Sequence, residues 1–133
     1  MSNGILIFDR HETVRGRTRA YLEKEGFRIC GETGDGHEAF AKTKILEPDI
    51  VVMDLTSAFD LVPELLKCCP SPKILIFTLH EGSEFSQMAR LLGAEGFALK
   101  NEPNSLTAEV RRLLGEPLTS GRNILIQKSP DKS

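Results

Sequence analysis

The chain has 133 residues with a formal net charge of −2, and its 40% hydrophobic and 27% charged residues fit one ordinary globular domain. This charge balance predicts no nucleic-acid footprint and no membrane partner, and no apolar run approaches the roughly 20 residues that span a bilayer. The N-terminus has no basic region and its apolar run is too short for a signal peptide, so we expect no export. Three cysteines without a regular framework (Cys30, Cys68 and Cys69) indicate a reducing compartment, and we expect a cytoplasmic location.

Short apolar runs predict the strands of a sheet. Four of them are continuous rather than alternating, which is typical of strands covered on both faces of a parallel sheet: residues 5–8, 50–53, 74–77 and 97–99. A fifth run, at 27–30, alternates between apolar and polar residues and suits the edge of a sheet.

The stretches between these runs are long enough for helices, which we predict at residues 12–25, 37–46, 60–69, 83–92 and 103–114. Glycine and proline residues mark their ends: Gly26 and Gly93 follow two of them, and Pro103 lies at the start of the last. Strand and helix therefore alternate five times. This order predicts an α/β fold with a five-stranded, parallel, doubly wound sheet flanked by five helices.

We place the domain at residues 1–115 and a C-terminal linker or tail at 116–133. The tail is rich in Pro, Gly, Ser and Lys and has one apolar island at 124–126. An extra element that docks on the domain, or the remnant of a linker to another domain, is the alternative interpretation. Eighteen residues are too few for a helix-turn-helix output domain.

Polar and charged residues directly follow four of the predicted strands. Asp9 and Arg10 follow the first strand, Asp54 the third, Thr78 the fourth and Lys100 the fifth. In doubly wound sheets, ligands bind beyond the carboxyl ends of the strands, where the strand order reverses. We therefore expect these side chains to form one site at that edge of the sheet.

These segments resemble the receiver domain of two-component response regulators, over about residues 4–115. The segments that carry the resemblance are 5–9 (ILIFD), 31–39 (GETGDGHEA), 48–55 (PDIVVMDL), 76–78 (IFT) and 93–100 (GAEGFALK). Each is weak alone, but five in the expected order are specific. The resemblance implies a flavodoxin-like, receiver-type fold. Asn101 after Lys100, where a proline is common, is similar to the branch that usually carries a helix-turn-helix output domain.

The resemblance also implies a role for each site residue. Asp54 would accept a phosphoryl group from a histidine kinase or phosphotransfer protein, a reaction that needs mainly positioning and charge neutralisation. Lys100 and Thr78 would stabilise the phosphoryl oxygens, and Asp9 would belong to the acidic pocket. Phe97 occupies the position of the family's switch aromatic. The domain would be a signalling phosphoacceptor and not a turnover enzyme, with self-phosphorylation and slow autodephosphorylation at most.

The sequence departs from the family at the metal site. The family has two adjacent acidic residues after the first strand, and here the second is Arg10. The ligands left for Mg²⁺ would be Asp9, Asp54 and the backbone carbonyl of Thr56, and a nearby guanidinium repels the metal, so we expect any Mg²⁺ to be held weakly. Arg10 either pairs with Asp54, in place of the metal's charge, or turns out to solvent.

Two further departures lie near the nucleophile. The segment at 55–61 lacks the family's usual proline and Asp-Gly turn, and we expect it to be a shortened loop. Leu79 stands where a small residue usually follows the threonine, and we expect it to narrow access to Asp54. The arginines at 15, 17 and 19 spread around the first predicted helix, and we expect them to be solvated.

Two functions remain open on these residues. In the first, phosphorylation of Asp54 switches the surface from the fourth helix to the fifth strand, which then binds an output protein or an output domain. In the second, the chain is an interaction module that works without phosphorylation, locked by an Arg10–Asp54 pair. A flavodoxin-like cofactor binder is less well supported, because residues 9–12 (DRHE) are opposite in charge to a phosphate loop. The family resemblance is also compatible with a homodimer, and it implies no membrane contact and no direct binding of nucleic acid by this domain.

Overall fold

Five parallel strands form a single sheet in the computed structural model, which describes residues 3–115. The strands are β1 (Ile5–Phe8), β2 (Ile29–Thr33), β3 (Ile50–Met53), β4 (Lys73–Thr78) and β5 (Gly96–Leu99). Their spatial order is β2-β1-β3-β4-β5, and every neighbouring pair is parallel. The predicted fold class is therefore confirmed. The predicted tail at 116–133 lies outside the described residues.

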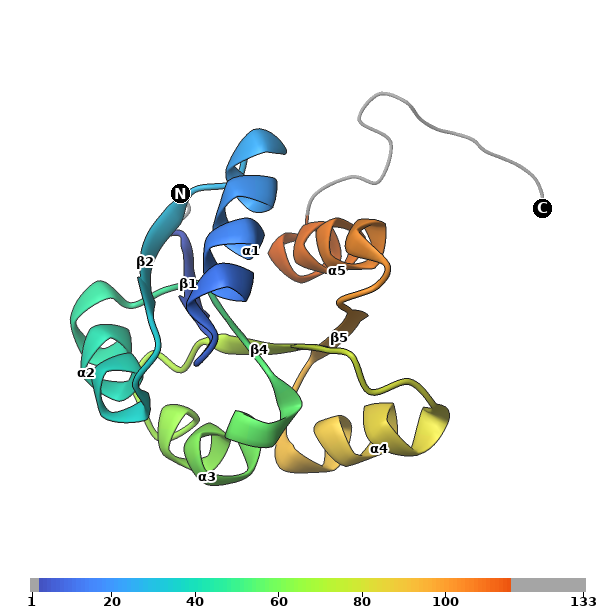
Figure 1. The fold of residues 1–133 in the computed structure, drawn as a ribbon. Helices are drawn as coiled ribbons and strands as arrows, with labels where there is room; N and C mark the ends of the chain where they lie inside the picture. The colour runs from blue at the N-terminus through green and yellow to red at the C-terminus, as the bar shows by residue number, and fades with distance from the viewer. Residues whose placement is uncertain (1–2, 116–133) are drawn as a thin grey trace.

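The helices cover both faces of this sheet (Figure 1). Helices α1 (Glu12–Lys24) and α5 (Pro103–Leu114) lie on one face, and α2 (Gly36–Leu46), α3 (Leu55–Leu65) and α4 (Ser83–Leu92) lie on the other. No helix in the described part of the chain is long and apolar enough to cross a membrane.

Alternating side chains of the strands supply two separate core layers, because successive residues of a strand point to opposite faces. Leu22 of α1 and Leu106, Val110 and Leu113 of α5 pack on one face of the sheet against buried strand residues (Ile5, Ile7, Ile50, Val52, Leu75 and Phe77). Residues of α2, α3 and α4 pack on the other face against the intervening ones (Leu6, Phe8, Val51, Met53, Ile74 and Ile76). Burial on both faces explains why the strands read as continuous apolar runs.

The third helix begins five residues earlier than predicted. It was expected at 60–69, after a loop, but it spans Leu55–Leu65 and follows β3 with Asp54 as its N-cap residue. The early start buries an apolar stripe that includes Leu55, Ala58 and Leu61. Pro63 lies inside this helix.

The edge strand also differs from its prediction. It was expected at 27–30, but β2 spans Ile29–Thr33. Phe27 lies in the segment that follows α1, where its backbone N–H donates to the carbonyl of Leu22 and its ring lies under the Arg111 guanidinium of α5. The strand pairs only with β1, so its predicted place at the edge of the sheet is confirmed.

Candidate functional site

Lys100 joins the carboxylates of two strands at the C-terminal edge of the sheet. Its Nζ lies 3.0 Å from Asp9 Oδ2 and 3.2 Å from Asp54 Oδ1. The side chains of Lys100, Asp9 and Asp54 are 12%, 7% and 20% exposed. The backbone N–H of Lys100 donates to the carbonyl of Thr78, which extends the β4–β5 pairing by one residue and fixes the base of the lysine. One ammonium group therefore neutralises two carboxylates that come from positions 91 and 46 residues away in the sequence.

Asp54 is held from its other side by Thr56. Its Oδ2 accepts hydrogen bonds from the Thr56 hydroxyl at 2.6 Å and from the Thr56 backbone N–H at 3.2 Å. Burial by itself raises the pKa of Asp54, but the hydrogen bond from Thr56 and the charge of Lys100 outweigh it, and the pKa is held below its usual value. Asp54 is therefore an ionised carboxylate at neutral pH, as a nucleophile must be.

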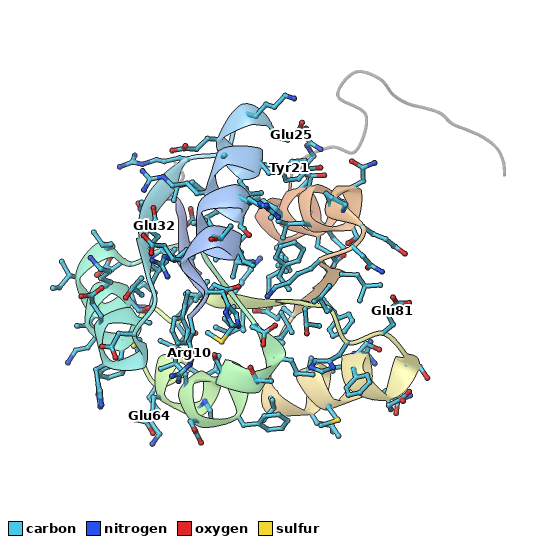
Figure 2. All side chains as sticks on the ribbon, viewed as in Figure 1. Arg10, Tyr21, Glu25, Glu32, Glu64 and Glu81 are labelled. Atoms are coloured by element: carbon cyan, nitrogen blue, oxygen red, sulfur yellow. The ribbon has the colours of Figure 1, made fainter. Side chains whose placement is uncertain are left out.

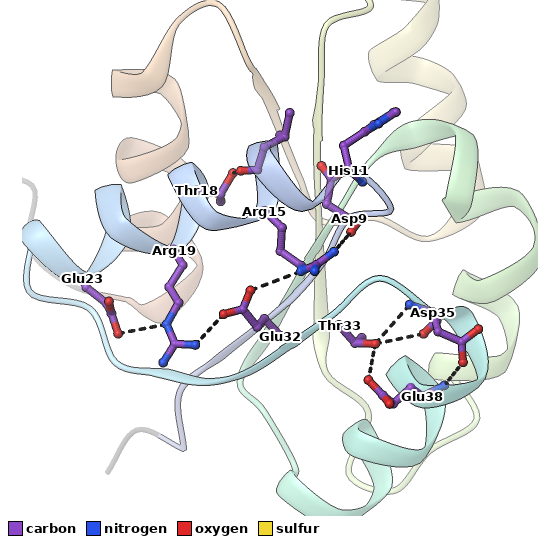
Figure 3. A network of polar contacts seen from close by, with 11 residues as sticks. Asp9, His11, Arg15, Thr18, Arg19, Glu23, Glu32, Thr33, Asp35 and Glu38 are labelled. Atoms are coloured by element: carbon purple, nitrogen blue, oxygen red, sulfur yellow. Dashed lines mark hydrogen bonds and ion pairs between the residues drawn. The ribbon is translucent and has the colours of Figure 1, made fainter.

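A chain of polar contacts fixes Asp9. Its Oδ1 accepts a hydrogen bond from the backbone N–H of His11 at 2.9 Å, and its carbonyl accepts one from Arg15 Nη1 at 2.7 Å. Figure 3 shows how Arg15 then pairs with Glu32 of β2, which also pairs with Arg19. The expectation that these arginines are solvated is wrong for Arg15, whose side chain is 18% exposed and pairs with Glu32, whereas the side chain of Arg19 is 40% exposed beside the same carboxylate.

Arg10 turns away from the two carboxylates. Its Nε lies 3.5 Å from Ser57 Oγ, and its guanidinium carbon lies 5.8 Å from the centre of the Phe8 ring. Figure 2 shows Arg10 at the edge between α2 and α3. Of the two predicted placements, the pairing of Arg10 with Asp54 is wrong, because the ion pair of Asp54 within the described residues is with Lys100. The locked module that rested on this pairing therefore loses its support.

Thr78 and Phe97 lie on the two strands beyond β3. Thr78 ends β4 and is fully buried, and its Oγ1 accepts a hydrogen bond from the backbone N–H of His80 at 3.3 Å. Phe97, in β5, is partly buried and packs against the core layer beneath α2, α3 and α4. Neither side chain contacts Asp54 through a hydrogen bond in this structure, so their predicted roles concern a state that follows phosphorylation.

Leu79 is the exposed residue directly after β4. It is 65% exposed and lines a cavity of about 380 Å³ between α1 and α5, together with Val14, Tyr21 and Leu106. Lys100, which contacts Asp54, lines the same cavity, so the narrowing of access to Asp54 by Leu79 stays a prediction.

The side chains at this edge do not form a ready Mg²⁺ site. All four carboxylate oxygens of Asp9 and Asp54 already accept from Lys100, His11 or Thr56. Arg10 stands where the family has the second residue of its acidic pair. Thr56 lies in the first turn of α3 instead of a loop, so its carbonyl points along the helix axis toward the backbone N–H groups of the next turn. Among residues 3–115, no group of three His, Cys, Asp or Glu side chains is arranged to hold a metal ion.

Sequence reasoning missed two residues that hold the site together. Arg15 fixes the backbone of Asp9, and the hydroxyl of Thr56 fixes the carboxylate of Asp54. The contact of Thr56 had a signal in the sequence, because an aspartate directly before an apolar stripe at helical spacing is typical of a helix N-cap. The contact of Arg15 had no signal in the sequence, because its partner is the backbone carbonyl of Asp9.

Comparison with known proteins identifies the family. Residues 5–111 match the response regulator receiver domain. The chemotaxis protein CheY of Thermotoga maritima is 32% identical over 104 residues, which cover 75% of this chain and 87% of that protein. The transcription regulator BvgA of Bordetella pertussis is 30% identical over 106 residues, covering 77% of this chain and 51% of BvgA. The chain thus spans about half the length of the regulators of this type that it matches.

Solved structures show the same fold. A LuxR-family response regulator from Aurantimonas sp. SI85-9A1 superposes with a TM-score of 0.67 at 30% identity, over 84% of this chain and 85% of that one. The isolated receiver domain of RcsB from Salmonella enterica serovar Typhimurium superposes with a TM-score of 0.74 at 23% identity, over 85% of this chain and 90% of that one. Together with the match over residues 5–111, these similarities show that the chain belongs to the response regulator receiver domains, the phosphoacceptor modules of two-component signalling.

Proposed function

We propose that Asp54 is the phosphoacceptor of this receiver domain. The observation that carries the proposal is the Lys100 Nζ at 3.2 Å from Asp54 Oδ1, because it sets an ionised, half-buried carboxylate beside a cation at the carboxyl ends of the strands. Phosphoryl transfer asks the protein mainly for positioning and for neutralisation of charge. Asp54 and Lys100 supply both.

The transfer we propose uses the oxygen that faces Lys100. Asp54 Oδ1 forms a bond to phosphorus while the N–P bond of a phosphohistidine donor breaks, and the electron pair of that bond returns to the imidazole nitrogen. The product is an acyl phosphate on Asp54. Oδ2 is the poorer nucleophile, because it already accepts two hydrogen bonds from Thr56. Lys100 then moves from Asp9 toward the phosphoryl oxygens, and the hydroxyl of Thr78 donates to them.

Receiver domains typically bind Mg²⁺ in their acidic pocket, and we propose that this one binds it weakly. Arg10 removes one carboxylate and adds a positive charge, and Lys100 already occupies the space between Asp9 and Asp54. Lys100 is thus the main cation available to the transferred group. Chemistry by the domain alone is limited to self-phosphorylation from a small phosphodonor and slow hydrolysis of the acyl phosphate.

The partners follow from the family. Response regulators receive the phosphoryl group from a histidine kinase or a phosphotransfer protein and act on an output protein or output domain. We propose that the surface from α4 to β5 binds the output partner, because the ring of Phe97 packs beneath it and can respond to a movement of Thr78. The free thiols of Cys30, Cys68 and Cys69 support a reducing, cytoplasmic location. Formation of a homodimer, and the absence of direct nucleic-acid binding by this domain, also remain predictions.

Intact mass after incubation with acetyl phosphate tests the proposal. We expect one phosphoryl adduct on the parent chain and none on the Asp54→Ala variant, because the methyl group has no oxygen to attack phosphorus. Asp60→Ala is a matched control, since Asp60 is an exposed carboxylate on α3 and its loss leaves Asp54 in place. An adduct that survives in Asp54→Ala would contradict the proposal.

A further inference from the structure

Arg10 is held by weak contacts in this structure. Its Nε lies 3.5 Å from Ser57 Oγ, farther than the roughly 2.7–3.2 Å of an ordinary N–H···O hydrogen bond. Its guanidinium carbon lies 5.8 Å from the centre of the Phe8 ring, close to the outer limit of about 6 Å for a cation–π contact. Arg10 is exposed, and it has no ion pair with another residue of the range 3–115. Its guanidinium can therefore change partners without breaking a strong contact.

Both ends of the Arg10 side chain lie near Asp54. At the backbone end, Arg10 directly follows Asp9. The carboxylates of Asp9 and Asp54 lie 3.0 and 3.2 Å from the same Nζ, that of Lys100. At the other end, Arg10 contacts Ser57, whose backbone N–H donates to the carbonyl of Asp54 at 3.2 Å. Rotation about the side-chain bonds of Arg10 is therefore enough to bring its guanidinium to a group attached to Asp54.

Phosphorylation changes the charge that this guanidinium faces. In the structure, the single ammonium of Lys100 already serves two carboxylates, those of Asp9 and Asp54. A phosphoryl group brings about two negative charges and three acceptor oxygens, so the site becomes more negative by about one unit. An ammonium is a point charge, whereas a planar guanidinium donates two parallel hydrogen bonds to phosphoryl oxygens. The phosphorylated site therefore calls for a second cation, and Arg10 has the geometry for it.

The carboxylates closest to Arg10 in its present position do not hold it. Arg10 shares a cavity of about 520 Å³ between α2 and α3 with Asp35, Asp60 and Glu64. Asp35 is the N-cap residue of α2, and Glu64 pairs with Lys67 at 3.6 Å. Asp60 is exposed, and water screens its single charge. A group with two negative charges on Asp54 is a stronger partner than any of the three.

We propose that Arg10 is a second phosphoryl-binding residue of this domain, beside Lys100. When Asp54 carries the phosphoryl group, the guanidinium leaves Ser57 and Phe8 and donates to the phosphoryl oxygens. The inference rests on the proposed function, since it needs the acyl phosphate on Asp54. Because the phosphodonor brings the same charge to the site, Arg10 also speeds the transfer by holding these oxygens as they approach Asp54. The residue that replaces a carboxylate of the family's acidic pair thus supplies a cation in its place.

Initial rates of adduct formation with acetyl phosphate, read from intact mass in the presence of a chelator, test this role. The chelator is needed because loss of Arg10 also removes a repulsion of Mg²⁺. We expect Arg10→Ala to react about tenfold more slowly than the parent chain, a smaller loss than for a buried charge-stabilising group because Arg10 is exposed. Arg10→Lys, which keeps the charge but not the planar fork, should react at a rate between these two. Arg28→Ala is the matched control, because it removes the same charge from an exposed position just before β2, at the opposite end of the strands.

The NMR signal of the Arg10 Nε–Hε group reports the movement itself, and its absence in Arg10→Lys assigns it. We expect this signal to shift when the adduct forms on the parent chain. It should stay in place when acetyl phosphate is added to Asp54→Ala, which has no oxygen to accept the phosphoryl group.

The outcomes separate the role of Arg10 from the proposed function. If Arg10→Ala reacts as fast as the parent in the chelator, or if the Nε–Hε signal does not move in the adduct, Arg10 does not bind the phosphoryl group and Asp54 remains the phosphoacceptor. An adduct that forms on the parent only when Mg²⁺ is added overturns the role of Arg10 in the same way, because the metal is then the second cation. No adduct in either condition overturns both proposals.

Discussion

Replacing Lys100 by methionine should slow the formation of the phosphoryl adduct by about 100-fold, the typical loss when one group that stabilises a developing charge is removed. Methionine keeps the length and the apolar stem of the side chain but leaves the transferred oxygens without their nearest cation. Initial rates of adduct formation with acetyl phosphate, read from intact mass, measure this effect. Lys67→Met is the matched control, because Lys67 is 73% exposed and pairs with Glu64 away from the site.

The same variant makes a prediction about stability and pH. The charge of Lys100 is one of the causes that lower the pKa of Asp54, so the folded state gains stability from this carboxylate above its unfolded pKa of about 3.9 and loses it as the pH falls through the lower, folded pKa. Lys100→Met should therefore be less stable at pH 7, by about 1–3 kcal/mol, because two half-buried carboxylates lose their shared partner. The deficit should shrink below about pH 4, as Asp54 becomes protonated. Urea unfolding at the two pH values measures it, and a deficit that does not depend on pH would contradict the electrostatic role of Lys100.

Replacing Arg10 by aspartate should tighten Mg²⁺ binding. The change adds a carboxylate beside Asp9 and Asp54 and removes a positive charge, a difference of two unit charges near a divalent ion. At about 6 Å in water this difference is worth on the order of 2–3 kcal/mol before screening by salt, which corresponds to an affinity gain of about 30- to 150-fold. Titration of backbone amide shifts with Mg²⁺ measures the affinity.

Arg10→Ala separates the two causes in this experiment. It removes the guanidinium without supplying a ligand, so we expect it to recover only a small part of the affinity gained by Arg10→Asp. A parent chain that binds Mg²⁺ as tightly as Arg10→Asp would show that Arg10 is not what weakens the metal site, and that Lys100 yields its place between the carboxylates to the metal.

The fold was predictable because its signals are local. Strands buried on both faces leave continuous apolar runs, and glycine and proline mark the ends of the helices, so β1 and β3 were placed at their observed residues. The third helix was misplaced because its start depends on one side chain. Asp54 caps it through Thr56, and the expectation of a family-like loop at 55–61 concealed a helix that buries Leu55 and Ala58.

The site was predictable where it depends on strand ends, and unpredictable where it depends on rotamers. The parallel sheet brings Asp9, Asp54 and Lys100 to one edge, and their contacts follow from the topology. The direction of Arg10 does not follow, because either of two partners was within reach of its long side chain. Phe8 and Ser57 hold it, and Lys100 has already neutralised Asp54.

The arrangement suggests how a receiver domain works with one metal ligand missing. Asp54, the proposed nucleophile, is kept ionised by Lys100 at Oδ1 and by Thr56 at Oδ2, without a divalent ion. Both contacts come from the protein itself, so they form when the chain folds. We expect phosphoryl transfer to Asp54 to be slower than in a domain that holds Mg²⁺, because an ammonium carries half the charge of Mg²⁺ and bridges fewer phosphoryl oxygens.

Chemical trapping of the acyl phosphate tests the central claim most directly. Borohydride reduces an aspartyl phosphate to homoserine, and peptide sequencing by mass spectrometry then locates it. After treatment with acetyl phosphate in the presence of a chelator, we predict homoserine at position 54 and at no other aspartate. Homoserine at Asp9 or another acidic residue, or none in any peptide with or without Mg²⁺, would contradict the assignment of Asp54 as the phosphoacceptor.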